Sequence, residues 1–289
     1  MFRNFLYAVF AILIIGLGGV LLVGGSLADP QVGLVGVPPK GFQFESLEIE
    51  RADGKKVAGW FVAGEIGKPG VLLLHSVRSN RKEMIGRAKF LVEAGYSALL
   101  IDMQAHGETP GENITFGFRE SFDVRAAVNY LQRRVEPQKV GVIGVSLGGA
   151  AALLGESPVQ ADAVILEAVY SSIERAVENR ISIRLGNVSK YLAPLLTWQI
   201  EPRLGISLEE LSPLRAIGNL KAPVMIVAGI DDRHTKSEES RQLFEEACEP
   251  KQLWLIDGAK HENLHSYAGK EYEKRVLLFF RKHLEGANA

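Results

Sequence analysis

The sequence predicts an α/β protein with a mostly parallel sheet flanked by helices. Short apolar runs alternate with helix-forming stretches, and this alternation is typical of parallel strands joined by right-handed crossovers. The chain has 289 residues, 47% of them hydrophobic, which is enough to bury a large core. The formal net charge is −1 and no basic stripe is present, so we expect no nucleic-acid partner.

The amino-terminal segment differs in composition from the rest of the chain. The stretch Phe5–Ala28 carries no charge, and Arg3 precedes it. About 20 apolar residues suffice to cross a bilayer, so we interpret residues 1–28 as a transmembrane anchor. A cleaved signal peptide is the alternative because Ser26-Leu27-Ala28 is a small-x-small site, although the apolar core exceeds the roughly 7–15 residues typical of such peptides. The charge of Arg3 predicts a cytoplasmic amino terminus and a catalytic domain on the exoplasmic (periplasmic or extracellular) side.

Residues 29–41 are predicted to be a linker, which includes the turn Pro38-Pro39-Lys40-Gly41. Two runs of strand-like composition, Phe44–Glu50 and Val57–Val62, then flank Asp53-Gly54. An Asp-Gly turn between two such runs predicts a β-hairpin.

Continuous apolar runs follow, as expected of parallel strands that are buried on both faces. Catalytic groups of such sheets lie at the carboxyl ends of the strands. The predicted strands are Val71–Leu74, Ala98–Ile101, Val140–Val145, Ala163–Leu166, Val224–Ala228 and Leu253–Ile256, and helices are predicted over Arg81–Glu93, Ser121–Arg134 and Ser237–Ala247.

One long interval breaks this alternation. It separates the strand that ends near Ala168 from the strand that begins at Val224, and it contains the apolar and aromatic run Tyr191–Trp198. The run has no strand pattern and is too apolar for a disordered segment. We therefore expect residues 171–211 to form a small helical cap over the site, between strands 6 and 7; additional core helices are the alternative.

The pattern Gly144-x-Ser146-x-Gly148 joins a predicted strand to the helix-forming run Ala150–Leu154. Strand, sharp turn and helix are the context of a nucleophile elbow, in which glycines avoid collisions and the serine hydroxyl rises above the sheet. We predict that Ser146 is a nucleophile. A dinucleotide-binding G-x-G-x-x-G is out of register, because its second glycine falls on Ser146. A packing turn with an incidental serine is the remaining alternative.

A serine nucleophile requires a base and an orienting acid. His261 follows the last predicted strand, and Asp231 and Asp232 follow the preceding one, so all three lie at the edge where Ser146 emerges. Either aspartate is suited to orient the histidine. The chain order of nucleophile, acid and histidine is that of the α/β hydrolases.

From roughly Phe42 to Leu284 the chain resembles the α/β hydrolases, and it is similar to their serine aminopeptidase and monoglyceride-lipase-like branch. This resemblance implies an α/β-hydrolase domain over residues 42–289. Four segments carry it: Leu74-His75-Ser76-Val77, Asp102–Thr109, the elbow around Ser146, and Gly258–Asn263.

The resemblance also implies roles for individual residues. The family spacing Gly-x-x-Asp selects Asp232 over Asp231, and the family's oxyanion hole maps to the backbone N–H groups of Leu147 and Val77. The pair His75-Ser76 stands where the family has His-Gly, and serine tolerates unusual backbone angles less well than glycine.

A competing motif overlaps the predicted base. His261-Glu262-Asn263-Leu264-His265 matches the H-E-x-x-H helix of zinc metallopeptidases. However, His261 directly follows a glycine turn, before a helix can begin, whereas both zinc ligands must share one helical face. A zinc peptidase is therefore kept only as an alternative.

The sequence thus predicts a serine hydrolase that cleaves an ester, thioester or amide through an acyl-enzyme, without a metal or cofactor. The apolar cap and the anchor indicate a small-molecule substrate that is lipid-like or acylated. A non-catalytic binding protein on the same fold is the alternative, and the complete set Ser146, Asp232 and His261 argues against it.

Overall fold

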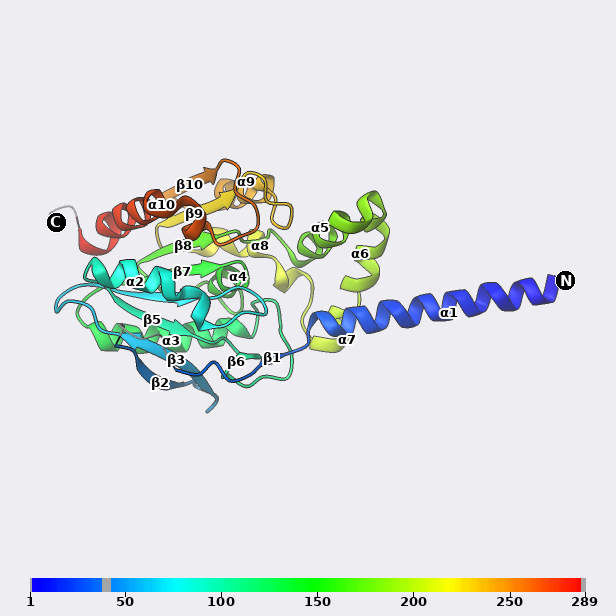
Figure 1. The fold of residues 1–289 in the computed structure, drawn as a ribbon, viewed down its shortest axis with the longest axis horizontal. Coiled ribbons are helices and arrows are strands. Elements are labelled where there is room, and N and C mark those ends of the chain that lie inside the picture. Colours follow the sequence, from blue (N-terminus) through cyan, green and yellow to red (C-terminus); the bar gives the residue numbers. More distant parts are fainter. Residues whose placement is uncertain (1, 38–42, 287–289) are drawn as a thin grey trace.

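The computed structural model describes residues 2–37 and 43–286, without the side chains of residues 5, 6, 8, 9, 11–13 and 15. The predicted turn Pro38–Gly41 lies outside the described residues. At the centre is an eight-stranded sheet with the order β10-β9-β8-β7-β4-β5-β3-β2 (Figure 1). Its strands are β2 (Glu45–Glu50), β3 (Lys56–Val62), β4 (Gly70–Leu74), β5 (Ser97–Ile101), β7 (Val140–Val145), β8 (Ala163–Glu167), β9 (Val224–Gly229) and β10 (Lys251–Ile256).

The sheet is parallel except around β3, which is antiparallel to both β2 and β5. The predicted hairpin is therefore confirmed, with Ile49 opposite Val57. The strands predicted from the apolar runs are also confirmed. The predicted helix over Arg81–Glu93 is instead divided into a 3₁₀ turn, η1 (Arg81–Met84), and α2 (Ile85–Glu93).

Alternate residues of the central strands enter two separate cores. In β4, Leu72 and Leu74 belong to one core, and Val71 and Leu73 belong to the other. Because both faces are covered, these strands are continuous apolar runs rather than alternating ones. The first core is covered by α3 (Glu120–Val135), α4 (Leu147–Leu153) and α9 (Ser237–Glu246), and the second by α2 and α10 (Leu264–Phe280), which continues into η5 (Arg281–Glu285).

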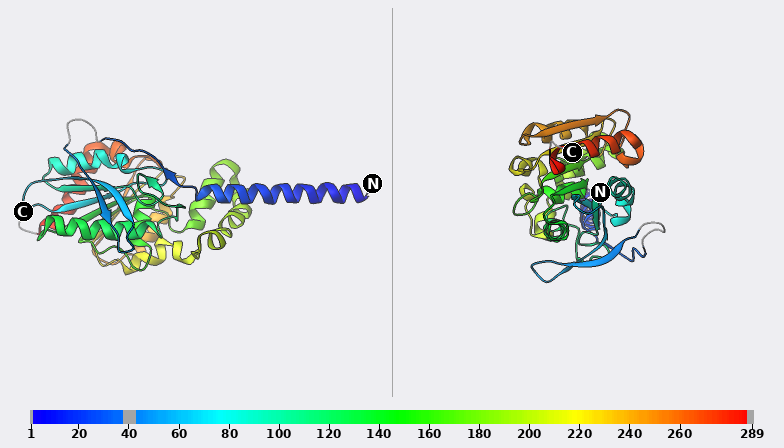
Figure 2. Two further views of the ribbon diagram at one scale, coloured as in Figure 1. Left: turned by 90° about the horizontal axis from the view of Figure 1, so that it is seen from below. Right: turned by 90° about the vertical axis from the view of Figure 1, so that its left-hand side faces the viewer.

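The interval between β8 and β9 is helical. Its two longest helices, α5 and α6, project beyond the carboxyl edge of the sheet and lie beside the first helix (Figures 1 and 2). The elements of this interval are α5 (Ile173–Leu185), η2 (Gly186–Val188), α6 (Ser189–Thr197), α7 (Ile200–Leu204), η3 (Glu209–Leu211), α8 (Pro213–Ala216) and η4 (Ile217–Asn219).

The predicted transmembrane segment forms a single helix, α1 (Phe2–Leu27), which points away from the sheet (Figure 2). The prediction that it spans a membrane is not supported: within the described parts of the chain, no helix combines the length and the apolar character needed for a crossing.

The residues after α1, predicted as a linker, are attached to the domain. The two-residue strand β1 (Gln31–Val32) pairs in parallel with β6 (His106–Gly107). Beyond it, the amides of Val35 and Gly36 donate to Glu108 Oε1 at 3.0 and 3.1 Å. A two-residue strand has no periodicity, so the sequence contains no local signal for this attachment.

Candidate active site

Ser146 lies between β7 and α4 with φ +49° and ψ −107°. A non-glycine residue in this part of conformational space costs on the order of 1–3 kcal/mol, and it persists only where the surroundings enforce it. Here the Ser146 amide donates to the carbonyl of Glu167 at 2.8 Å, and its carbonyl accepts from Ala150 in the first turn of α4. The strained turn therefore presents the side chain at the carboxyl end of β7.

The two glycines of the elbow are required by close backbone approach. A Cβ at Gly144 would lie 2.6 Å from the amide nitrogen of Gly149, and one at Gly148 would lie 2.6 Å from the carbonyl oxygen of Leu74. Real Cβ atoms essentially never make contacts this short. The G-x-S-x-G pattern is thus a steric consequence of packing α4 against β4 and β7.

Asp232 and His261 are brought together from the ends of β9 and β10. His261 Nδ1 lies 2.7 Å from Asp232 Oδ2, and the Thr235 hydroxyl donates to the same oxygen at 2.7 Å. The amides of His234 and Thr235 donate to Asp232 Oδ1 at 2.7 and 3.0 Å. Burial raises the pKa of Asp232, but the hydrogen bonds from His261 and Thr235 outweigh burial and hold this pKa below its ordinary value. The carboxylate therefore stays ionised beside the imidazole.

The local sequence did not decide between Asp231 and Asp232. In the structure, Asp232 is the aspartate in contact with His261. Asp232 is buried, whereas Asp231 is exposed and its amide donates to the carbonyl of Ala259. The ring of His234 packs against that of His261 with centroids 4.9 Å apart. Sequence reasoning did not identify His234 or Thr235, although both lie within three residues of Asp232.

Ser146, Asp232 and His261 share one edge of the sheet, because β7, β9 and β10 all run in the same direction. Ser146 is nearly buried, with 3% of the residue exposed. Its hydroxyl makes no hydrogen bond to any residue that the structure describes, so Ser146 and His261 are not hydrogen-bonded in this state. Hydrogen bonds of catalytic groups are often formed only when substrate is present.

A cavity of about 220 Å³ opens at Ser146. Val77 and Leu147, predicted to supply the oxyanion hole, both line it. Among the described residues, neither backbone N–H group donates to an acceptor. Ser76 adopts no left-handed conformation; its amide and hydroxyl instead donate to Glu83 at 2.9 and 2.8 Å. The left-handed residue of this loop is Arg78, with φ +59°.

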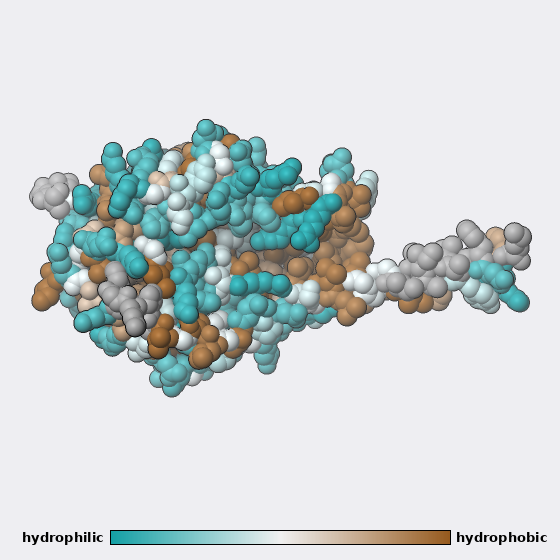
Figure 3. Space-filling view, viewed as in Figure 1, coloured by the Kyte–Doolittle hydropathy of each residue, from teal (hydrophilic) through white to brown (hydrophobic). Residues whose placement is uncertain are grey.

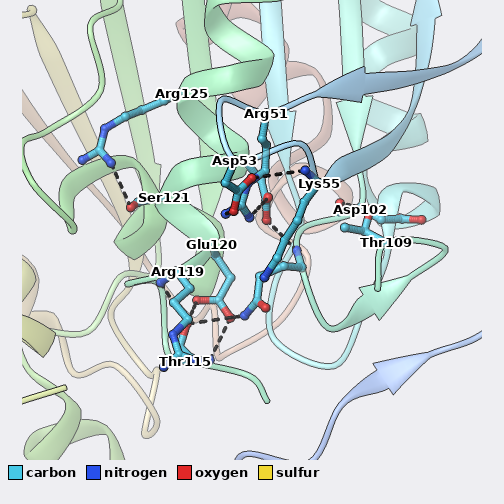
Figure 4. Close-up of polar contacts among 12 residues, drawn as sticks. Arg51, Asp53, Lys55, Asp102, Thr109, Thr115, Arg119, Glu120, Ser121 and Arg125 are labelled. Atoms are coloured by element: carbon cyan, nitrogen blue, oxygen red, sulfur yellow. Dashed lines mark hydrogen bonds and ion pairs between the residues drawn. The ribbon is translucent and has the colours of Figure 1, made fainter. Parts of the chain in front are cut away.

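Part of the cavity wall comes from the loop that precedes α3. Phe116 lines the cavity, and its carbonyl accepts a hydrogen bond from the hydroxyl of Tyr170 at 2.5 Å. The loop is braced by Glu120, which accepts hydrogen bonds from Thr115 (Figure 4). Glu120 also accepts from the side-chain amide of Gln104. This buried polar network holds the aromatic wall in place.

The overlapping H-E-x-x-H motif does not form one helical face. Helix α10 begins at Leu264, with Asn263 as its cap, so His261 precedes the helix. His265 packs between Phe90 and Tyr272. Within the described part of the chain, no group of three or more histidine, cysteine or acidic side chains is arranged to hold a metal ion.

His75 and His106 are fully buried, with ring centroids 5.0 Å apart. His75 Nδ1 donates to the carbonyl of Ser76 at 2.7 Å, and its Nε2 accepts from the amide of Met103 at 3.1 Å. Burial lowers the pKa of His75 to about 3. His75 is therefore a neutral residue that connects the loop after β4 to the loop after β5.

Comparisons with known proteins agree with this architecture. No family model matches the chain. YqkD of Bacillus subtilis, an uncharacterised protein, is 24% identical over 245 residues, which cover 82% of this chain and 80% of YqkD.

Solved structures are similar over most of the chain. The esterase Pf2001 of Pyrococcus furiosus has a TM-score of 0.72 at 22% identity, with 89% of this chain and 98% of that chain covered. The α/β hydrolase GrgF from Penicillium has a TM-score of 0.65 at 19% identity, with 84% and 99% covered. The chain therefore has the α/β-hydrolase fold.

Proposed function

We propose that this protein is a serine hydrolase in which Ser146 is the nucleophile, His261 the general base and Asp232 the orienting acid. The observation that carries the proposal is the strained serine elbow, in which Ser146 has φ +49°. It lies at the sheet edge where His261 Nδ1 is 2.7 Å from Asp232 Oδ2. The resemblance to the serine aminopeptidase and monoglyceride-lipase-like branch supports the same assignment.

In the proposed reaction, Ser146 Oγ attacks an ester, thioester or amide carbonyl while His261 Nε2 accepts its proton. This step requires the two side chains to come into hydrogen-bonding reach once substrate is bound. Asp232 holds Nδ1 of the ring protonated and stabilises the imidazolium that forms. His261 then protonates the leaving group, and water, activated by the same ring, cleaves the acyl-enzyme.

The negative charge of the tetrahedral intermediate would be bound by the backbone N–H groups of Leu147 and Val77. Both residues line the Ser146 cavity, and neither group has an acceptor among the described residues. A donor of this kind is typically worth about 3 kcal/mol of barrier height. The amino end of α4 also points its partial positive charge at this position.

The proposal is tested with Ser146→Ala. We expect this variant to lose both fluorophosphonate labelling and ester hydrolysis, because no other group would form the acyl-enzyme. Ser157→Ala is the matched control: Ser157 is exposed, its side chain makes no hydrogen bond to a described residue, and the change should leave both readouts unaltered. Hydrolysis by Ser146→Ala at the unaltered rate would reject the serine mechanism.

A second pair of variants distinguishes the serine hydrolase from the zinc metallopeptidase. His261→Gln should abolish activity, whereas His265→Gln should leave the chemistry intact because His265 packs away from Ser146. Equal loss in both variants, with activity that a chelator removes and zinc restores, would favour the metallopeptidase.

A further inference from the structure

A second cavity, of about 580 Å³, lies between α1, α5 and α6. Its walls are mainly apolar, with Val20 and Val23 from α1, Ile181 from α5, and Leu192 and Leu196 from α6. Figure 3 shows apolar side chains gathered where α1 leaves the body of the molecule. We call this cavity the α1 groove.

The α1 groove adjoins the Ser146 cavity. Leu27, Val177 and Arg180 line both spaces. Polar contacts hold the groove together: the side chains of Gln199 and Arg203 donate to the carbonyls of Val20 and Leu21 at 3.0 and 2.8 Å. The space at the predicted nucleophile therefore borders the space along the first helix.

Arg180 stands at the junction without a carboxylate of its own. It makes no hydrogen bond or ion pair with the residues that the structure describes. Asp232 is close enough to affect it, but both oxygens of that carboxylate are already used by His234, Thr235 and His261. Burial, and then the nearby charge of Arg78, lowers the pKa of Arg180. A partly buried guanidinium without a partner is unfavourable, so this position suits an anion supplied by a ligand.

Arg78 places a second positive charge at the same cavity. It lines the Ser146 space, and its one hydrogen bond among the described residues goes from Nη2 to the carbonyl of Ser26. The cavity thus combines the predicted nucleophile with two cations, and it adjoins the mainly apolar α1 groove.

We propose that the substrate is an anionic amphiphile: an ester whose carbonyl lies at Ser146, whose anionic alcohol part pairs with Arg180 and Arg78, and whose acyl chain lies in the α1 groove. The inference rests on the proposed hydrolase function and adds the substrate class. It also gives α1 a role in binding the substrate.

The groove is tested with nitrophenyl acetate and nitrophenyl dodecanoate. The unaltered protein should prefer the dodecanoate, because each methylene that leaves water contributes about fourfold to binding. Val23→Trp should fill the groove and reduce this preference at least about tenfold in kcat/KM, the equivalent of about two buried methylenes. Leu22→Trp is the matched control, since Leu22 is 77% exposed and does not line the groove.

The anion site is tested with three esters that share one acyl chain: the monododecanoyl esters of glycerol, glycerate and glycerol phosphate. The unaltered protein should prefer the charged esters, and the better of the two identifies a carboxylate or a phosphate as the anion. Arg180→Gln should reduce the preference about tenfold, as expected for a lost charged hydrogen bond. Arg175→Gln should not change it, because Arg175 is exposed on the same helix and pairs with Glu178.

The outcomes distinguish the two proposals. Equal kcat/KM for the neutral and charged esters would overturn this inference and leave the hydrolase proposal standing. The same holds if Val23→Trp lowers kcat/KM equally for nitrophenyl acetate and nitrophenyl dodecanoate. Failure of the unaltered protein to cleave even the acetate would overturn the proposed function and this inference with it.

Discussion

At the scale of single residues, the buried carboxylate of Asp232 organises the candidate site. It accepts from two backbone amides, one hydroxyl and the imidazole of His261. A carboxylate only accepts hydrogen bonds, so it imposes one tautomer on His261, with the proton on Nδ1. That tautomer leaves Nε2 free to take a proton from Ser146.

Asp232→Asn should therefore lower kcat strongly while changing KM little. An asparagine places an NH₂ group among four donors and allows the wrong imidazole tautomer, and the corresponding change in a serine protease costs about 10⁴ in kcat. Asp231→Asn is the matched control. Because Asp231 is exposed, its replacement should lower kcat by less than about tenfold. The measurement is kcat on nitrophenyl acetate, with folding checked by thermal melts. A crippled Asp231→Asn beside an active Asp232→Asn would show that the neighbouring aspartate is the acid.

At the scale of elements, the elbow depends on how closely α4 approaches the sheet. The β7–α4 turn leaves no room for a side chain at Gly144 or Gly148, and Ser146 accepts a left-handed backbone as a result. Local strain is thus stabilised by the packing of a buried helix against two strands.

Gly148→Ala should destabilise the protein by about 3 kcal/mol or more, because its Cβ meets the backbone of β4 at 2.6 Å. Gly218→Ala is the matched control. There the nearest atom lies 3.5 Å away and φ is ordinary, so the change should be neutral or stabilise by up to about 1 kcal/mol. Urea unfolding of both variants measures the difference. Equal stability of the two proteins would contradict the packing argument.

At the scale of the whole molecule, the segment after α1 is part of the folded domain. Gln31 and Gly33 donate to the carbonyls of Ala105 and Gly107, each at 2.7 Å, and Val35 is buried. The segment therefore fixes where α1 leaves the domain, beside α6. The exoplasmic location of the domain stays a prediction.

A chain that begins at Gln43 should be less stable to heat than a chain that begins at Ala28. The shorter chain loses the β1–β6 pairing and both hydrogen bonds to Glu108. At about 1 kcal/mol for each lost hydrogen bond, Tm should fall by about 10 °C. Thermal melts of both chains test this, and equal melting temperatures would show that the segment contributes no stability.

The sequence by itself determined the central sheet, the elbow and the position of the histidine. Strands buried on both faces require continuous apolar residues, and a sharp strand-to-helix turn requires glycines. Both patterns are visible in residues that are neighbours in the sequence. His261 follows because it directly succeeds a recognisable strand. Such local signals do not depend on how distant segments pack.

The residues by themselves left Asp231 and Asp232 open, and only the family spacing favoured Asp232, which the structure places against His261. Only the tertiary structure decided how residues 31–36 attach and where Arg180 lies. Adjacent aspartates have the same local pattern, and their side chains differ only in the direction that the folded loop gives them. The bonds from Val35 and Gly36 to Glu108 join residues more than seventy positions apart. The junction at Arg180 likewise needs α1 and α5 side by side, and no periodicity within either helix encodes that placement.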